Sequence, residues 1–196
     1  MESISSSLQP TDLEEICTTL IDSANFRMLM RIGLQNDWDF LDQICTSTNV
    51  SKNTLDALLY FAINTDEIHE IFCKIVEIAS PSSFSVDWIN RLITFPNEYI
   101  KISCIISLAH KDLPISLLKI LCETNCCFEC YFSLVVASYT SPLVGVDEFE
   151  ANVLCFINSP YSVLSKELNL EIQAHKPNES EKSRIWMGHM QKKLNQ

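Results

Sequence analysis

The chain has 196 residues, a length that suits one domain or one elongated array with a sizeable hydrophobic core. Apolar residues make up 47% of the chain, which excludes an intrinsically disordered protein. The formal net charge is −11, and an acidic protein repels phosphate backbones, so we expect no nucleic-acid binding. Only three glycines occur, too few and too scattered for a phosphate-binding loop.

The negative charge is concentrated in the first half of the chain. Residues 1–100 hold 15 acidic and 5 basic side chains, whereas residues 101–196 hold 10 and 9. The simpler interpretation of these charges is a solvated surface that keeps the protein soluble. The alternative is an acidic surface that attracts a protein partner with a basic surface.

The N-terminal sequence and the cysteines indicate the compartment. The first residues, MESISSSLQP, lack the basic start and the apolar run of a signal peptide. No apolar stretch reaches the roughly 18–20 residues that cross a bilayer, so we expect no membrane span. The nine cysteines do not have the spacing of a small disulfide scaffold and fit a reducing compartment. We therefore expect a cytoplasmic or nuclear protein.

Apolar residues recur at helical spacing along nearly the whole chain, which predicts a series of short helices and no strands. A capping box at Thr11 and Glu14 indicates the first helix start, and Ser51 indicates another. Pro96 is expected in the first turn of a helix whose apolar stripe is Tyr99, Ile102, Ile106 and Ala109. In chain order, the stripes span residues 13–21, 26–34, 38–45, 55–62, 68–79, 88–93, 99–109, 117–122, 126–138, 149–157, 161–168 and 185–194.

Composition divides the chain into four segments. Residues 1–10 are rich in serine and end in proline, so we expect a disordered tail. A helical-repeat domain follows over residues 11–173, and residues 174–182 are a polar linker. Residues 183–196 are expected to form a terminal amphipathic helix. That helix either closes the array or docks onto a partner groove or an anionic surface.

Four cysteines hint at a repeating unit. Cys17, Cys45, Cys73 and Cys104 are separated by 28, 28 and 31 residues, and each follows an apolar or small residue. A repeat of that length is typical of stacked helical hairpins. Chance spacing is the alternative, because the flanking residues do not otherwise match.

Residues 87–124 resemble an armadillo- or HEAT-type repeat. In WINRLITFPNEYIKISCIISLAHKDLPISLLKILCET, a turn with Pro96 and Asn97 separates two helices, and Ser103 and Ala109 are small residues on the second. The resemblance implies a right-handed helical stack whose curved face binds proteins. Members of this superfamily act as import receptors, chaperone adaptors or stimulators of nucleotide exchange on small GTPases. The asparagine ladder of import receptors has no counterpart here.

Cys122, Cys126, Cys127 and Cys130 lie together in LCETNCCFECYF. Zinc sites usually use two separated ligand pairs, but only one C-x2-C is present and the glycines of a zinc knuckle are missing. On one helix, Cys126 and Cys130 would be a turn apart and the cysteines would line the core. Core packing is therefore favoured, and metal binding and redox sensing stay open as alternatives.

No other residues form a recognisable catalytic set. The histidines, at 69, 110, 175 and 189, are scattered, and His69 lies between Glu67 and Glu70, which suits an exposed helix face. A nucleophile needs a base within hydrogen-bonding reach, and the sequence shows no such pair.

Together these features predict an all-α protein, a right-handed α-solenoid of armadillo or HEAT character, with an irregular helical bundle as the alternative. We expect a non-enzymatic protein-binding scaffold, adaptor or regulator, whose client is a small GTPase or another protein. No catalytic, cofactor-binding or metal-binding residue is assigned. The alternative is a cysteine-dependent or zinc-binding enzyme, or a redox sensor, centred on residues 122–130.

Overall fold

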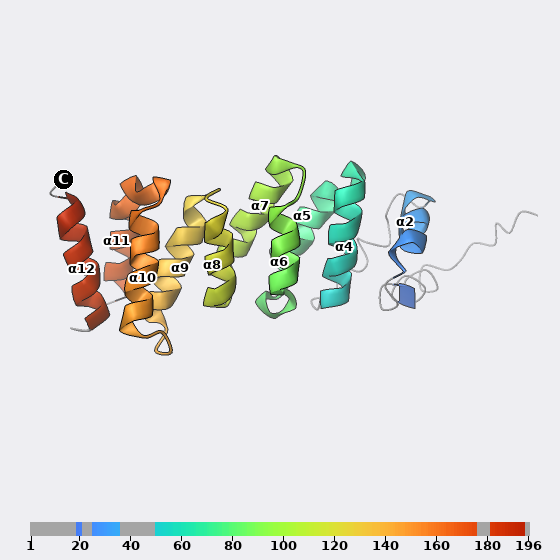
Figure 1. Ribbon diagram of the computed structural model, residues 1–196. Coiled ribbons are helices and arrows are strands. Elements are labelled where there is room, and N and C mark those ends of the chain that lie inside the picture. The colour runs from blue at the N-terminus through green and yellow to red at the C-terminus, as the bar shows by residue number, and fades with distance from the viewer. Residues whose placement is uncertain (1–18, 21–24, 36–49, 176–180, 195–196) are drawn as a thin grey trace, which may run out of the picture. The chain divides into compact units, whose positions relative to one another are not determined.

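A computed structural model describes residues 19–20, 25–35, 50–175 and 181–194 of the chain (Figure 1). Within these ranges the protein is all-helical and has no strand, which confirms the all-α part of the prediction. None of the helices found there is long and apolar enough to cross a bilayer. The capping box at Thr11 and the helix predicted over residues 38–45 lie outside the described residues.

The helices are short and follow one another closely, as the apolar periodicity predicts. Three of the turns between them are 3-10 helices: Asp66–Ile68, Pro81–Ser83 and Pro160–Leu164. The α-helices are α2 (Phe26–Gln35), α4 (Lys52–Asn64), α5 (His69–Ile78), α6 (Val86–Ile93), α7 (Glu98–Ala109), α8 (Ile115–Glu123), α9 (Phe128–Thr140), α10 (Val146–Ile157), α11 (Ser165–Ala174) and α12 (Glu181–Leu194).

Polar side chains define the helix starts. The Ser51 hydroxyl accepts a hydrogen bond from the Thr54 N–H at 3.1 Å, so Ser51 is the N-cap of α4, as predicted. Asn97 has the same role in α7, because its Oδ1 accepts from the Ile100 N–H at 3.2 Å. The prediction that Pro96 lies in the first turn of that helix is therefore wrong, since α7 begins at Glu98.

The buried face of α7 also differs from the predicted stripe. Tyr99 is 77% exposed, whereas the buried residues of the helix are Ile100, Cys104, Ile105, Leu108 and Ala109. Most of the remaining residues of α7 are half-buried, so neighbouring elements cover much of the circumference of the helix. An evenly apolar helix of this kind gives the sequence no single stripe to reveal.

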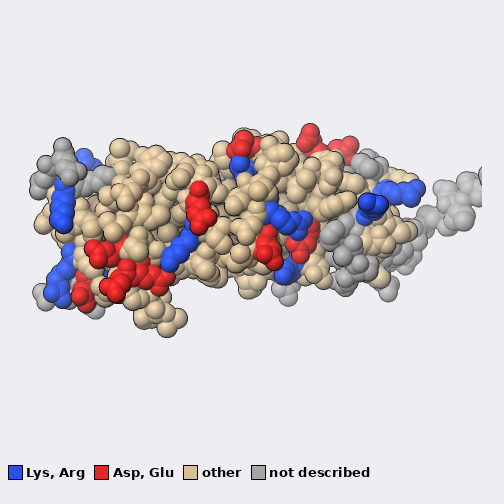
Figure 2. All heavy atoms as spheres, in the orientation of Figure 1, with Lys and Arg blue, Asp and Glu red and all other residues tan. Residues whose placement is uncertain are grey.

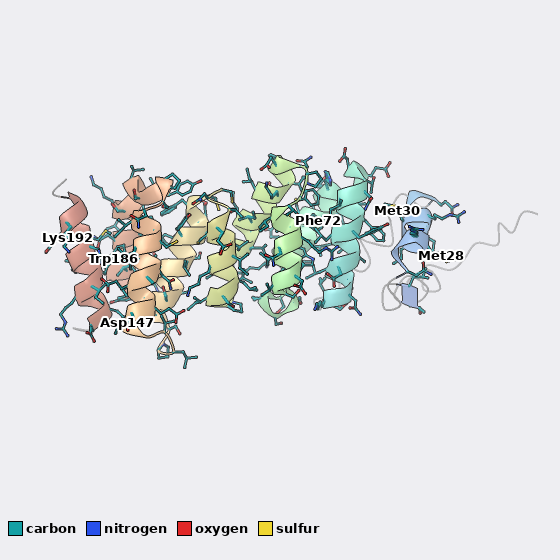
Figure 3. All side chains as sticks on the ribbon, in the orientation of Figure 1. Met28, Met30, Phe72, Asp147, Trp186 and Lys192 are labelled. Carbon is teal, nitrogen blue, oxygen red and sulfur yellow. The ribbon has the colours of Figure 1, made fainter. Side chains whose placement is uncertain are left out.

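The chain forms two compact units, residues 1–104 and residues 105–196. In the first unit α4 packs against α2 and α5. The core there is aromatic and includes Phe72, which Figure 3 labels. The ring centroid of Phe72 is 5.9 Å from that of the stacked Phe95 ring and 6.1 Å from that of Trp88. Trp88 is fully buried, and its indole N–H donates to the Leu55 carbonyl at 3.0 Å, which satisfies its polar atom.

His69 belongs to this core, so the expected exposed position is wrong. Its side chain is 12% exposed, Nε2 lies 2.9 Å from the Ala62 carbonyl oxygen, and its ring meets the Phe95 ring edge-on. Its acidic neighbours in sequence, Glu67 and Glu70, are exposed and do not share this buried position.

In the second unit α9 is the central helix. It packs against α8, α10 and α11, and α10 also packs against α12. The break between the stripes predicted over residues 126–138 and 149–157 lies at residues 141–145, which form the turn between α9 and α10. Buried apolar side chains from these helices form the core, among them Leu118, Leu134, Val135, Phe149 and Phe156.

The apolar side of α12 is buried. Trp186 and Met190 are 1% and 4% exposed, and the Trp186 N–H donates to Asn169 Oδ1 on α11 at 2.9 Å (Figure 3). This face is therefore occupied within the chain and is not free to dock onto a partner. Ala174 ends α11 and Glu181 begins α12, and most of the predicted linker between them lies outside the described residues.

Candidate functional site

The turn between α8 and α9 has an unusual backbone. Asn125 has a φ of 50°, a left-handed conformation that asparagine tolerates better than other residues with side chains. Two tyrosine hydroxyls hold it: Tyr131 donates to Asn125 Oδ1, and Tyr161 donates to the Asn125 carbonyl at 3.0 Å. The Tyr131 hydroxyl oxygen also lies 2.9 Å from the Cys122 carbonyl oxygen, at the end of α8, so its one proton is shared between these two acceptors. The turn is thus fixed by contacts from α9 and from the 3-10 turn before α11.

This turn brings three thiols together. The Sγ atoms of Cys126, Cys127 and Cys130 all lie within 4.8 Å of one another, and Cys127 Sγ is 3.2 Å from Cys130 Sγ. We call these three residues the thiol cluster. Cys127 and Cys130 are buried, and Cys126 is partly exposed. Cys122 lies on α8, is also buried, and does not belong to the cluster.

The predicted placement of these cysteines on one helix is wrong. α9 begins at Phe128, so Cys126 and Cys127 precede it and only Cys130 lies on it. Cys127 is the N-cap, and no side chain makes a capping hydrogen bond there. The left-handed turn at Asn125 is the reason, because it folds the chain back before the helix starts.

The thiol cluster is arranged to carry a negative charge. Hydrogen bonds from Cys127 and Cys130 lower the pKa of Cys126 to about 3, and the Thr124 hydroxyl, 3.0 Å from Cys126 Sγ, adds to the effect. The hydrogen bond to Cys126 raises the pKa of Cys127 to about 12, and the pKa of Cys130 is raised for the same reason. One thiolate shared by two S–H donors therefore lies at the positive end of α9.

The cluster has no histidine beside it. Within the described ranges, the group of side chains placed to hold a metal consists of these three cysteines alone. Histidine partners lie elsewhere: His189 Nε2 is 2.9 Å from Glu150 Oε1, and His175 Nδ1 is 2.9 Å from the Glu171 carbonyl oxygen. The cluster accordingly offers thiolate ligands or nucleophiles without a general base.

A second feature of this unit is an open groove of about 840 Å³. Its floor is apolar, with Leu113, Phe132, Val136 and Val144, and its wall includes an ion pair between Lys119 and Glu148 at 2.7 Å. Leu143, on the turn between α9 and α10, is 94% exposed at the rim. We call this feature the α8–α9 groove.

Charged side chains of both signs line the groove. Glu148, in the first turn of α10, is paired with Lys119, and the lining also includes His110, Lys111, Asp112 and His175. Asp147, which Figure 3 labels, occupies the same turn, where Figure 2 shows acidic side chains gathered, but it is not part of the lining. The groove therefore combines an apolar floor with a border of mixed charge.

No protein family, curated protein or solved structure matches the chain. The armadillo or HEAT resemblance of residues 87–124 accordingly stays a prediction. Of the four cysteines in residues 122–130, the structure places three close together: Cys126, Cys127 and Cys130. The groove had no sequence signal, because residues from α7, α8, α9 and α10 and from the segments that follow α7, α9 and α11 form it.

Proposed function

We propose that the protein is a non-enzymatic protein-binding module, a right-handed solenoid of armadillo or HEAT character whose α8–α9 groove receives a segment of a partner protein. The groove is the observation that carries the proposal. Covering the apolar lining with side chains of a partner removes that surface from water, which favours binding.

A contact between two periodic cysteines supports the repeat. Cys73 on α5 and Cys104 on α7 are 31 residues apart, and their Sγ atoms lie 3.8 Å from each other. In a stack of helical hairpins, equivalent positions of consecutive repeats meet in this way. Cys17 and Cys45, the other members of the series, lie outside the described residues.

The groove indicates what kind of segment fits. Its floor accepts apolar side chains such as leucine or phenylalanine, and 840 Å³ is room for several of them. Asp112, an exposed residue of the lining, favours a basic residue beside these anchors. We therefore propose an amphipathic, basic segment as the ligand, with a small GTPase or another protein as its carrier.

The test places a charge on the groove floor. Val136→Lys puts an ammonium group among the apolar lining residues, and Leu170→Lys is the matched control. Leu170 is 68% exposed on α11 and does not line the groove. Peptides selected from a random displayed library against the wild-type protein are measured for affinity to all three proteins.

We expect the selected peptides to combine apolar and basic residues and to lose at least about tenfold in affinity for Val136→Lys, because a desolvated charge opposes apolar burial. Leu170→Lys should bind them as the wild type does. Selection of no peptide, or equal binding by all three proteins, would contradict a protein-binding groove at this place.

A further inference from the structure

We propose that Cys126, Cys127 and Cys130 bind one Zn²⁺ ion through their three sulfur atoms, with the fourth coordination position open to solvent. The proposal is independent of the groove, because no cysteine of the cluster lines it. It concerns a site for a thiophilic divalent cation in a protein whose other features are those of a binding module.

The distances fit such a site. Zinc binds thiolate sulfur at about 2.3 Å, so ligand atoms in a tetrahedral site are separated by about 3.8 Å. All three Sγ atoms lie within 4.8 Å of one another, and Cys127 and Cys130 are already closer than the tetrahedral spacing, at 3.2 Å. The Cys127–Cys130 pair needs to widen by about 0.6 Å to reach the tetrahedral spacing.

The turn at Asn125 replaces the glycine that the sequence lacks. Zinc-binding turns need a backbone that reverses sharply between or before the ligands, and glycine usually supplies the left-handed residue. Asn125 supplies it here, with a φ of 50°, and the hydroxyls of Tyr131 and Tyr161 hold it. The absence of glycine therefore does not count against a metal site in this chain.

The chemistry of the three side chains also favours a cation. Thiolate is the form of cysteine that binds Zn²⁺, so zinc binding releases thiol protons to solvent. Zinc binding should consequently weaken as the pH falls.

The partial exposure of Cys126 favours Zn²⁺ over Cu⁺ and iron–sulfur clusters as the group that the cluster binds. Cys127 and Cys130 are buried, while Cys126 opens to solvent, which leaves a position for a water oxygen. A mixed sulfur and oxygen set suits borderline-soft Zn²⁺ better than the soft Cu⁺ ion, and iron–sulfur clusters ordinarily need four cysteines. The Thr124 hydroxyl, 3.0 Å from Cys126 Sγ, orients that ligand in the manner of outer-shell groups at zinc sites.

The test is a zinc titration of the full chain, reduced and freed of metal with a chelator, against a chromophoric zinc indicator. We expect one equivalent bound, with Cys126→Ser and Cys130→Ser each weakening the affinity at least about 100-fold, since even outer-shell losses cost 10–100-fold. Cys155→Ser is the matched control, because Cys155 is an exposed thiol on α10 outside the cluster. It should bind zinc as the wild type does.

Circular dichroism of each variant shows whether it is folded, so that loss of binding is not loss of structure. The proposal is overturned by a wild-type protein that binds no zinc, by binding that survives both cluster variants, or by an equal loss in Cys155→Ser. A wild-type protein that takes up Cu⁺ and not Zn²⁺ also overturns it. Failure of the groove test leaves this titration unaffected, so the two proposals fail separately.

Discussion

Different side chains lie beside the two ends of helix α9. At its C-terminal end the Lys182 ammonium, from α12, donates to the carbonyls of Ser138 and Ser141, both at 2.8 Å. The same ammonium lies 5.8 Å from the centre of the Phe149 ring, and burial lowers the pKa of Lys182. At the N-terminal end no side chain caps the helix, and the thiol cluster lies there instead.

The comparison separates a structural contact from a site. Cations stabilise the C-terminal end of a helix and anions its N-terminal end. At the C-terminal end the chain provides the counter-charge with a residue some 40 positions away, and two carbonyls accept hydrogen bonds from that ammonium group. At the N-terminal end it provides the partly exposed Cys126, whose lowered pKa favours the thiolate. The first contact links α12 to α9, whereas the Cys126 sulfur is accessible and can react or bind.

The largest expected difference is in thiol reactivity. With zinc removed, Cys126 should be a thiolate throughout the range from pH 6 to pH 9, because its pKa is lowered to about 3. Burial raises the pKa of Cys155, so its thiolate fraction rises about tenfold per pH unit, or about 1,000-fold over the same range. Iodoacetamide labelling followed by peptide mass analysis gives both rates. A Cys126 rate that rises as steeply as that of Cys155 would show that the cluster carries no thiolate.

The turn at Asn125 gives the next effect. Asn125→Val should lower the free energy of unfolding by about 2 kcal/mol, because a β-branched residue is strained at a φ of 50°. Asn125→Gly keeps the backbone and loses the hydrogen bond from Tyr131, so it should cost about 1 kcal/mol or less. Urea unfolding measures both. Equal costs for the two variants would mean that the backbone conformation contributes nothing.

A substitution at the C-terminal end of α9 should have the smallest effect, on the free energy of unfolding. Lys182→Met keeps the apolar stem and removes the ammonium, which should cost about 1 kcal/mol as the carbonyls of Ser138 and Ser141 lose their donor. Lys192→Met is the control, since Lys192 is exposed on the same helix (Figure 3). Urea unfolding should place that variant within about 0.5 kcal/mol of the wild type. Equal losses in the two variants would argue against a role for Lys182 at the helix end.

Most of the fold could be predicted, because helical periodicity and polar caps act locally. Ser51 and the break at residues 141–145 are where the pattern places them. The face of α7 was missed because neighbours cover much of that helix, and the position of His69 was missed because its partners, Ala62 and Phe95, lie in other elements. Local pattern does not report such tertiary contacts.

The thiol cluster was visible in the sequence only in part. The cysteines stand out, but their grouping depends on a left-handed Asn125 and on Tyr161, which lies 36 residues away. Cys127 and Cys130 are buried, as the core-packing interpretation expects, and the left-handed turn adds the contact with Cys126. No residue pattern specifies that backbone angle uniquely.

X-ray absorption at the zinc edge, on the full chain loaded with one equivalent of zinc, tests the central claim most directly. The account predicts three sulfur atoms at about 2.3 Å and one oxygen at about 2.0–2.2 Å. It also predicts that Cys126→Ser replaces one of those sulfur atoms with a lighter ligand. A first shell of oxygen and nitrogen alone, or a shell of three sulfur atoms that Cys126→Ser leaves unchanged, would contradict a zinc site at the start of α9.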